Sequence, residues 1–264
     1  MKLITLLTDF GLKDGYAGIL KGVILRISPE AQVVDLTHLI PPQAVLEGAL
    51  TLARCVPYFP TGTIHVAVVD PGVGTVRRPI AAQIGQHYFV GPDNGLFSLV
   101  ARPASSTGKP VRFFHLNQAR YWLPQLSSTF HGRDIFAPVA AHLANGVSLE
   151  QLGSEIHDAE RIQLPEPVRT GSGWEGQVIH VDTFGNLATN LTTEHLAGFT
   201  QVEILIAGIK IAGVAKAFGD RQAGEPVALV DSAGWLSIAE VNGNAARAWN
   251  VGVGTQVILQ KMGE

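Results

Sequence analysis

The 264-residue chain is 46% hydrophobic and 16% charged, a composition that predicts a folded protein with a substantial core and excludes a largely disordered one. Its net charge of −3, with no run of Lys and Arg, argues against nucleic acid as a partner. The single cysteine, Cys55, cannot form an internal disulfide, and Asp9 interrupts the N-terminal apolar run too early for a signal peptide. No segment approaches the roughly 20 apolar residues that span a bilayer. We therefore expect a cytoplasmic protein without a membrane partner.

The first part of the chain alternates apolar strands with segments of helical periodicity. Strands are predicted at 3–7, 32–36, 64–69, 79–84, 87–90 and 111–116, and helices at 14–27, 45–56 and 135–143. Asp14 and Asp134 precede two of these helices as N-caps, and residues 102–110 have the composition of a surface loop. This order predicts an α/β domain over residues 1–164, with a mostly parallel sheet flanked by helices.

The pattern changes near Leu164. Residues 165–174 are rich in Pro and Gly and read as a linker. Helical periodicity then largely disappears, and short strands follow at 176–181, 202–206, 209–214, 226–230, 236–241 and 256–260. We therefore expect a smaller all-β domain over residues 175–264, either a barrel or a sandwich.

Two acidic residues follow predicted strands of the first domain. Asp70 ends the buried strand 64–69, and Asp9 comes just after the first strand. Ligands of open α/β sheets collect at this edge, where the loops after the strands converge. Arg77 lies seven residues beyond Asp70 and is followed by Arg78. The Pro and Gly residues between Asp70 and Arg77 allow the chain to fold back. Taken alone, the pair is better explained by a capped turn with a surface ion pair.

His131 lies just before the helix predicted at 135–143. A helix N-terminus disfavours a protonated imidazole, so a neutral ring is expected there. The nine His residues show no spacing typical of a metal site, and no metal is expected.

Five motifs in order along both domains resemble the S-adenosyl-L-methionine (SAM) hydroxide adenosyltransferase family, the adenosine-forming SAM hydrolases, a sister group of the fluorinase and chlorinase. The motifs are Thr8-Asp9-Phe10-Gly11, Val69-Asp70-Pro71-Gly72-Val73-Gly74 with Arg77-Arg78, Phe130-His131-Gly132-Arg133-Asp134, Phe184-Gly185-Asn186 and Asp231-Ser232-Ala233-Gly234. The resemblance implies a homotrimer that binds SAM between the N-terminal domain of one subunit and the C-terminal domain of the next. It implies no cofactor, since SAM is the substrate.

The family reaction is attack of hydroxide on the ribose C5′ of SAM, which gives adenosine and methionine. The resemblance assigns the catalytic triad to Asp70, Arg77 and His131, with Arg78 as a possible replacement for Arg77. This set suits the chemistry, because water with a pKa near 15.7 is a poor nucleophile unless its deprotonated form is favoured. A guanidinium stabilises hydroxide, a neutral His can accept the proton, and Asp70 can orient both.

The resemblance also assigns the substrate contacts. Asp9 would hold the ribose hydroxyls, Asp182 and Ser232 the methionine end, and Asn186 the adenosine part. Phe218 would stack on adenine, Phe184, Phe130 and Val73 would line a dry pocket, and Glu240 and Asn242 would complete the substrate site.

Two alternatives remain open at the sequence level. A halogenase on the same fold would use chloride, and Gly132 offers no obstacle to that ion. A non-catalytic SAM- or adenosine-binding protein would need no proton acceptor beside C5′, which argues against it.

Overall fold

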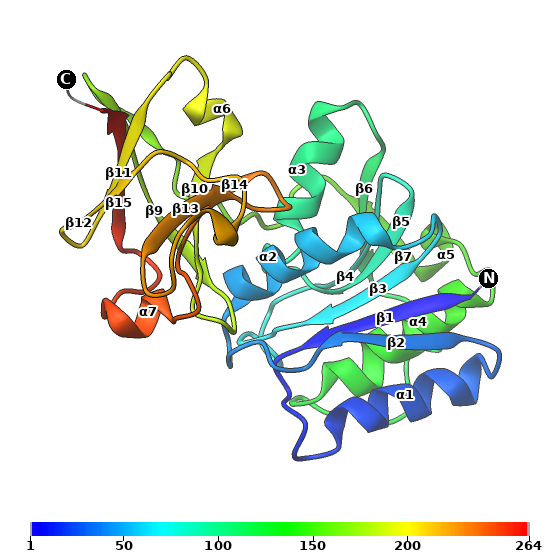
Figure 1. Ribbon diagram of the computed structural model, residues 1–264. Coiled ribbons are helices and arrows are strands. Elements are labelled where there is room, and N and C mark those ends of the chain that lie inside the picture. The colour runs from blue at the N-terminus through cyan, green and yellow to red at the C-terminus, as the bar shows by residue number, and fades with distance from the viewer. Residues whose placement is uncertain (1, 263–264) are drawn as a thin grey trace. The chain divides into compact units, whose positions relative to one another are not determined.

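The computed structural model describes residues 2–262, which form two compact units that divide after Gln163. In the described part of the first unit, a seven-stranded sheet has the order β2-β1-β3-β5-β4-β6-β7 (Figure 1). The strands are β1 (Leu3–Thr8), β2 (Gln32–Thr37), β3 (Ile64–Val68), β4 (Pro79–Ile84), β5 (His87–Pro92), β6 (Val111–Leu116) and β7 (Gly153–Ile156). Of the six strand pairs described, β1–β2, β1–β3 and β3–β5 are parallel and the other three are antiparallel. The expectation of a mostly parallel sheet was therefore wrong: the sheet is mixed, because the chain reverses at the hairpin β4–β5 and β6 and β7 continue antiparallel.

Helices cover both faces of this sheet (Figure 1). On one face, α1 (Tyr16–Ile27) and α4 (Ala137–Ala144) pack against alternate residues of β1 and β3, including Ile4, Leu6 and Val66. On the other face, α2 (Val45–Cys55) and α3 (Ser98–Ser106) pack against the intervening residues, such as Leu7 and Ala67. The central strands are apolar on both sides because each face is covered, as the run at 64–69 predicted.

Three local expectations for this unit were wrong. Residues 102–110, expected as a loop, include the end of α3, which continues through Pro103 because Ala104 is buried in the core. Helix α1 begins after Gly15, whose left-handed backbone (φ 68°) forms the N-cap in place of Asp14. Asp134 lies inside a helical turn and does not cap it. Short elements around the sheet edge, which the sequence did not indicate, are α5 (Leu149–Leu152) and β7.

A buried histidine lies in the middle of the sheet. His65 on β3 is fully buried, its Nδ1 lies 2.7 Å from Thr5 Oγ1, and its ring stacks on Phe89. Burial, helped by nearby His87, lowers the pKa of His65 from 6.5 to about 3. The folded protein therefore holds this ring neutral at a pH where the unfolded chain protonates it.

We expect this histidine to make the fold sensitive to acid. Between pH 6.5 and about 3 the unfolded chain binds a proton at His65 that the folded protein does not bind. The free energy of unfolding contributed by this group is fully present above pH 6.5 and falls by about 1.4 kcal/mol per pH unit as the pH decreases through that window. Urea titrations across the window should show a shallower loss for His65→Gln, whereas exposed His157→Gln should behave like the parent. Equal slopes for the two variants would contradict the assignment.

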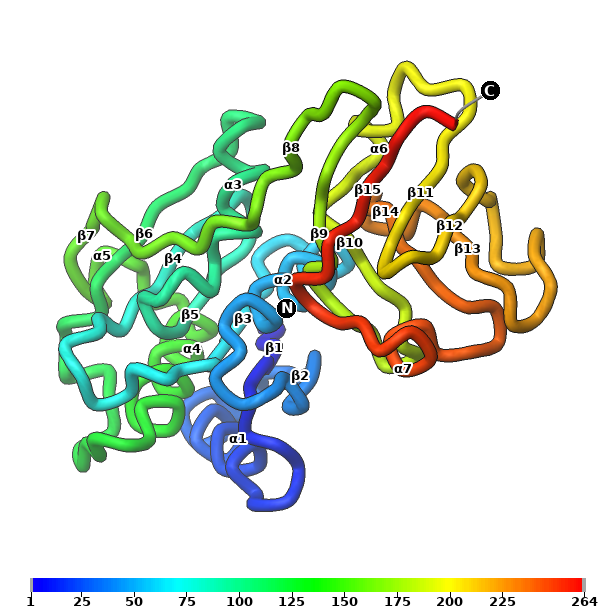
Figure 2. Tube along the Cα trace, turned by 90° about the vertical axis from the view of Figure 1, so that its left-hand side faces the viewer, coloured from blue at the N-terminus to red at the C-terminus, as the bar shows by residue number. Residues whose placement is uncertain are grey.

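The second unit, from Leu164 on, is built on one strongly curved sheet (Figure 2). Within the described residues its order is β12-β11-β15-β9-β10-β14-β13, with β8 paired to β9 off this path. The strands are β8 (Val168–Arg169), β9 (Gly173–Val181), β10 (Leu187–Thr192), β11 (Val202–Ile206), β12 (Ile209–Ala212), β13 (Pro226–Val230), β14 (Trp235–Glu240) and β15 (Gln256–Lys261). Short helices α6 (Thr193–Leu196) and α7 (Ala245–Ala248) complete the unit.

This sheet nearly closes on itself. Ala215, just past β12, forms a bridge to Leu229 on β13 and donates its N–H to Ala228 O at 2.8 Å. The enclosed core is apolar and includes Val178, Leu187 and Ile238. The curved arrangement is barrel-like, one of the two architectures expected from the strand pattern. Across residues 2–262, no helix has the length and apolar character needed to cross a bilayer.

Candidate active site

The carboxyl ends of two neighbouring parallel strands bring Asp9 and Asp70 to the same sheet edge. Thr8 at the end of β1 pairs with Val68 at the end of β3, and each aspartate follows within two residues. The Asp9 Oδ2 atom accepts a hydrogen bond from the Gln43 backbone N–H at 2.8 Å. Burial is the main cause of the raised pKa of Asp70, and the nearby charge of Asp9 adds to it.

Asp70 and Arg77 form a buried, two-point ion pair. Arg77 donates from Nε to Asp70 Oδ1 at 3.1 Å and from Nη2 to Oδ2 at 2.5 Å. The side chain of Arg77 is only 7% exposed and that of Asp70 only 6%. The loop reverses through a turn in which Val73 N–H donates to Asp70 O, and Gly74 adopts φ 77°. Burial raises the pKa of Asp70, and the charge and hydrogen bonds of Arg77 oppose that shift.

His131 completes the group from a distant part of the chain. Its Nδ1 lies 3.0 Å from Arg77 Nη2. Burial first, and then the charge of Arg77, lowers the pKa of His131, while Asp70 and Asp134 act in the opposite direction. The imidazole is therefore held neutral near pH 7, the state that its place beside a helix N-terminus predicted. The structure thus brings together the three side chains that the resemblance assigned to the triad.

A π-helical turn at Gly132–Phe136 carries His131 into this position and leads directly into α4. The last residue of that turn, Phe136, is fully buried, and its ring centre lies 5.5 Å from the Arg77 guanidinium carbon. A cation above an aromatic face is attracted to it, so Phe136 supports the plane of the guanidinium. Neither the π turn nor this contact has a sequence signal in a single chain.

Arg78 lies in a different network. It donates from Nε to buried Asp93 at 2.8 Å and from Nη1 to Asp158 at 2.8 Å. Asp93 also accepts from the Glu160 backbone N–H at 2.8 Å, which ties the β5 end to the last part of the first unit. Arg77, and not Arg78, is therefore the arginine in contact with Asp70 and His131.

The two loops that supply the triad touch at Gly74. A Cβ atom at this position would lie 2.3 Å from the Ser128 carbonyl oxygen. The loop of Ser128 is held in turn by Asp134, which is fully buried and accepts from the Ser127 N–H at 2.7 Å and from Arg133 at 2.6 Å. Sequence reasoning recognised Gly74 as a turn residue but had no means of finding this close approach.

Three aromatic rings form a wall beside the triad. Phe10, Tyr16 and Phe130 pack edge to face, with ring centres 5.3 to 6.1 Å apart. A Cβ on Gly132 would lie 3.2 Å from the Phe10 ring and 3.5 Å from the Phe130 ring. The apolar character expected near Phe130 is present, and Phe10 and Tyr16 extend it.

In the second unit, the candidate residues around Asp182 form a self-contained loop. The Asp182 carboxylate accepts from the backbone N–H groups of Phe184 and Asn186, both at 2.9 Å, and from Asn186 Nδ2 at 2.8 Å. The Phe184 side chain is 74% exposed. Asp182 and Asn186 are therefore in direct contact, and the ring of Phe184 on the same loop is exposed.

Ser232 lies in the turn that precedes β14, and the Asp182 loop lies nearer the other end of that strand. Leu187, next to the Asp182 loop, pairs with Ile238, whereas the turn of Ser232 precedes Trp235, three strand residues or roughly 10 Å away. Glu240 ends β14 on the Asp182 side, and Asn242 follows it with φ 55°. Phe218 is 45% exposed in a 3₁₀ turn between β12 and β13.

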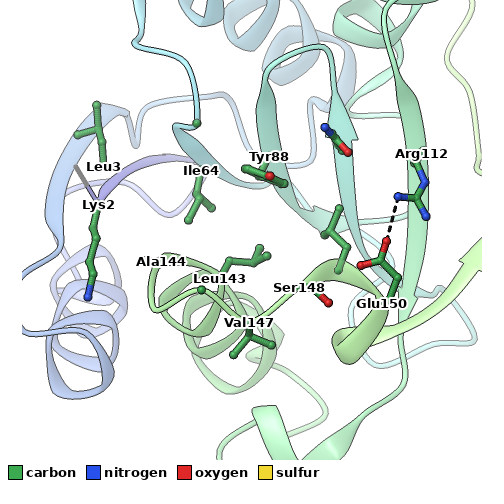
Figure 3. Close-up of a pocket in the computed structure, with 14 residues that line it drawn as sticks. Lys2, Leu3, Ile64, Tyr88, Arg112, Leu143, Ala144, Val147, Ser148 and Glu150 are labelled. Atoms are coloured by element: carbon green, nitrogen blue, oxygen red, sulfur yellow. Dashed lines mark hydrogen bonds and ion pairs between the residues drawn. The ribbon is translucent and has the colours of Figure 1, made fainter.

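A cavity of about 350 Å³ opens elsewhere in the first unit (Figure 3). It is lined at the starts of β1 and β3 by Leu3 and Ile64, the opposite end of these strands from Asp9 and Asp70. Of the charged side chains that line it, Arg112 is paired with Glu150 at 2.9 Å and also with Glu155 at 2.8 Å. None of the triad residues lines it.

Among residues 2–262, no cluster of three or more His, Cys, Asp or Glu side chains could hold a metal ion.

Comparison with known proteins identifies the family. Models of the N-terminal and C-terminal domains of SAM hydroxide adenosyltransferases match residues 4–153 and 176–258. The chain belongs to the SAM hydroxide adenosyltransferase family.

Members and relatives of this family match along nearly the whole chain. An (R)-S-adenosyl-L-methionine hydrolase of Thermus thermophilus is 41% identical, over 98% of this chain and 100% of the relative. A fluorinase of Actinoplanes is more distant, at 27% identity over 98% of this chain and 97% of the relative. The crystal structure of an uncharacterized conserved protein from Thermotoga maritima superimposes with a TM-score of 0.88 at 38% identity, covering 97% of this chain and 99% of that one.

Proposed function

We propose that this protein hydrolyses SAM to adenosine and methionine by attack of hydroxide at the ribose C5′. The proposal is supported by membership in the family, by relatives named as SAM hydrolases at 34% to 41% identity, and above all by the contacts among Asp70, Arg77 and His131. A halide is already an anion, whereas water becomes a good nucleophile only as hydroxide, which a guanidinium stabilises over water. An arginine fixed by a carboxylate therefore suits an oxygen nucleophile better.

The residues of the site divide the work by chemistry. Asp70 fixes the guanidinium of Arg77 through two hydrogen bonds, so the cation is in place before the reaction begins. Both Nη1 hydrogens remain available, because Arg77 Nη1 is buried and has no partner among the described residues. They can stabilise the negative charge of the nucleophile, while Asp9 at the same edge accepts hydrogen bonds from the ribose hydroxyls.

The charges of the reactants explain why a dry wall helps. Attack of an anion on a sulfonium ion neutralises both as the transition state forms. Water that solvates the separated charges therefore opposes the reaction. The rings of Phe10 and Phe130 provide an apolar wall beside Gly132. Displacement at C5′ also requires the nucleophile to lie in line with C5′ and sulfur. Such positioning contributes several kcal/mol in general, on the order of 7 or more in favourable cases.

The function is tested by incubating the purified protein with SAM in ¹⁸O-labelled water, with and without chloride, and separating the products by chromatography. We expect adenosine and methionine, with ¹⁸O in the 5′-hydroxyl of adenosine. A 5′-chlorinated nucleoside that forms only with chloride would support the halogenase. Unchanged SAM that nevertheless binds in calorimetry would support the non-catalytic binding protein.

We also propose that the protein acts as a homotrimer, as the family resemblance implies. The triad loop itself carries a fully exposed apolar side chain, Val76, and Leu12 and Leu39 near the same sheet edge are 69% and 67% exposed. Large apolar side chains gathered beside a site are typical of a surface covered by another subunit. Sedimentation equilibrium should give three times the 28.1 kDa mass of the chain, and a monomer at micromolar concentration would contradict the assembly.

A further inference from the structure

The contact between Arg77 and His131 fixes where the imidazole carries its proton. The guanidinium has only N–H donors and no acceptor. At 3.0 Å from Arg77 Nη2, His131 Nδ1 must therefore accept, and it carries no hydrogen. A neutral imidazole has one N–H, so the hydrogen lies on Nε2. Arg77 thus selects the tautomer of His131.

Neither Arg77 nor His131 then has a free, basic lone pair for a water proton, and both oxygens of Asp70 are already engaged. Arg77 cannot accept a proton. Each oxygen of Asp70 keeps a second lone pair, but both oxygens already accept from Arg77, whose charge opposes protonation of the carboxylate. The only lone pair of neutral His131, on Nδ1, faces the same guanidinium. The charged groups around His131 are Arg77, Asp70 and Asp134, and Asp134 is itself paired with Arg133.

We infer that His131 is a hydrogen-bond donor to the nucleophile through Nε2–H and not the base that deprotonates it. This inference rests on the proposed function and differs from the proton-accepting role expected from the sequence. The site selects hydroxide that has already lost its proton to solvent. The hydroxide oxygen forms the bond to C5′, the C5′–S bond breaks, and sulfur keeps its electron pair as the neutral thioether of methionine. The hydroxide hydrogen remains as the 5′-hydroxyl proton of adenosine.

Nuclear magnetic resonance tests the tautomer without any substrate. In protein labelled with ¹⁵N-histidine, two-bond nitrogen–proton correlations at pH 7.5 distinguish a protonated from an unprotonated ring nitrogen. The signals of His131 are assigned by their loss in His131→Gln. We expect a protonated Nε2 and an unprotonated Nδ1, and a proton on Nδ1 would overturn the inference. Because this measurement needs no turnover, it stands or falls separately from SAM hydrolysis.

A pair of substitutions tests the role in the reaction. The amide nitrogen of His131→Gln lies close to the position of Nε2 and can donate, whereas the amide of His131→Asn reaches only the position of Nδ1. Under the donor role, kcat of the Gln variant stays within about tenfold of the parent, while the Asn variant loses at least about 100-fold. Loss of general-base catalysis would instead lower both alike, by about 10² to 10⁴. Equal losses in two variants that melt like the parent would overturn the donor role.

The pH profile provides a second readout. If His131 were the base, the acid limb of kcat/KM would report its ionisation and would disappear in His131→Gln. For a donor, the acid limb reports the ionisation of bound water, so its slope persists in His131→Gln. Disappearance of the limb in that variant would contradict the inference.

Discussion

Replacing Arg77 by lysine should lower kcat by about 100- to 1,000-fold while leaving KM for SAM within a fewfold of the parent. Lysine keeps the positive charge but has a single nitrogen. It cannot bind both oxygens of Asp70, contact His131 Nδ1 and still present a free donor, all of which the guanidinium of Arg77 is placed to do. Steady-state kinetics of Arg77→Lys in the chromatographic assay measures the effect.

The neighbouring arginine supplies a matched control. Arg78→Lys makes the same change one residue away, in the network of Asp93 and Asp158. Because Asp93 is buried, we expect a lower melting temperature for this variant and a kcat close to that of the parent. The reverse result, with Arg78→Lys inactive and Arg77→Lys active, would place Arg78 at the nucleophile and contradict our assignment.

Replacing Gly74 by alanine should separate the two loops of the triad. The new methyl group would lie 2.3 Å from the Ser128 carbonyl oxygen, so one loop must move. A shift of about 1 Å in a reacting group can cost roughly 100-fold in rate, and we expect a loss in kcat of that order. The left-handed backbone at Gly74 adds about 1 to 2 kcal/mol of strain, which calorimetric unfolding should detect.

A second glycine separates strain from displacement. Gly108 also has a left-handed backbone, with φ 69°, but a Cβ atom added there would meet no other atom within 4 Å. Gly108→Ala should therefore lose comparable stability and retain full activity. Equal kcat values for Gly74→Ala and Gly108→Ala would contradict the prediction, because they would show that the contact between Gly74 and Ser128 does not position Arg77 and His131.

The sequence was sufficient to locate the acidic end of the triad. The apolar run before Asp70 predicted a buried strand, and residues that follow inner parallel strands must lie at one edge of the sheet. The choice between Arg77 and Arg78 could not be made in this way. Their sequence contexts are nearly equal, and the difference depends on Asp158, which lies 80 residues further along the chain.

The misplaced elements have a common cause in long-range packing. Composition assigned Pro103 and its neighbours to a loop, but burial of Ala104 against the sheet maintains the helix. The sequence did not indicate Leu187–Thr192 as a strand, because it contains polar Thr and Asn. It is nevertheless a central strand, and Thr189 donates to Leu236 O across the sheet. In both cases a contact distant in sequence outweighs local preference.

The π-helical turn at Gly132–Phe136 fixes the number of residues between His131 and the body of α4. A π turn holds more residues than an α turn and is rare outside functional sites. Losing one residue there would let the backbone relax to regular α-helical geometry, but it would swing His131 by about 100° around the helix axis. The imidazole would then leave Arg77. Length variation among natural homologues should consequently avoid this segment, even where surrounding loops tolerate it.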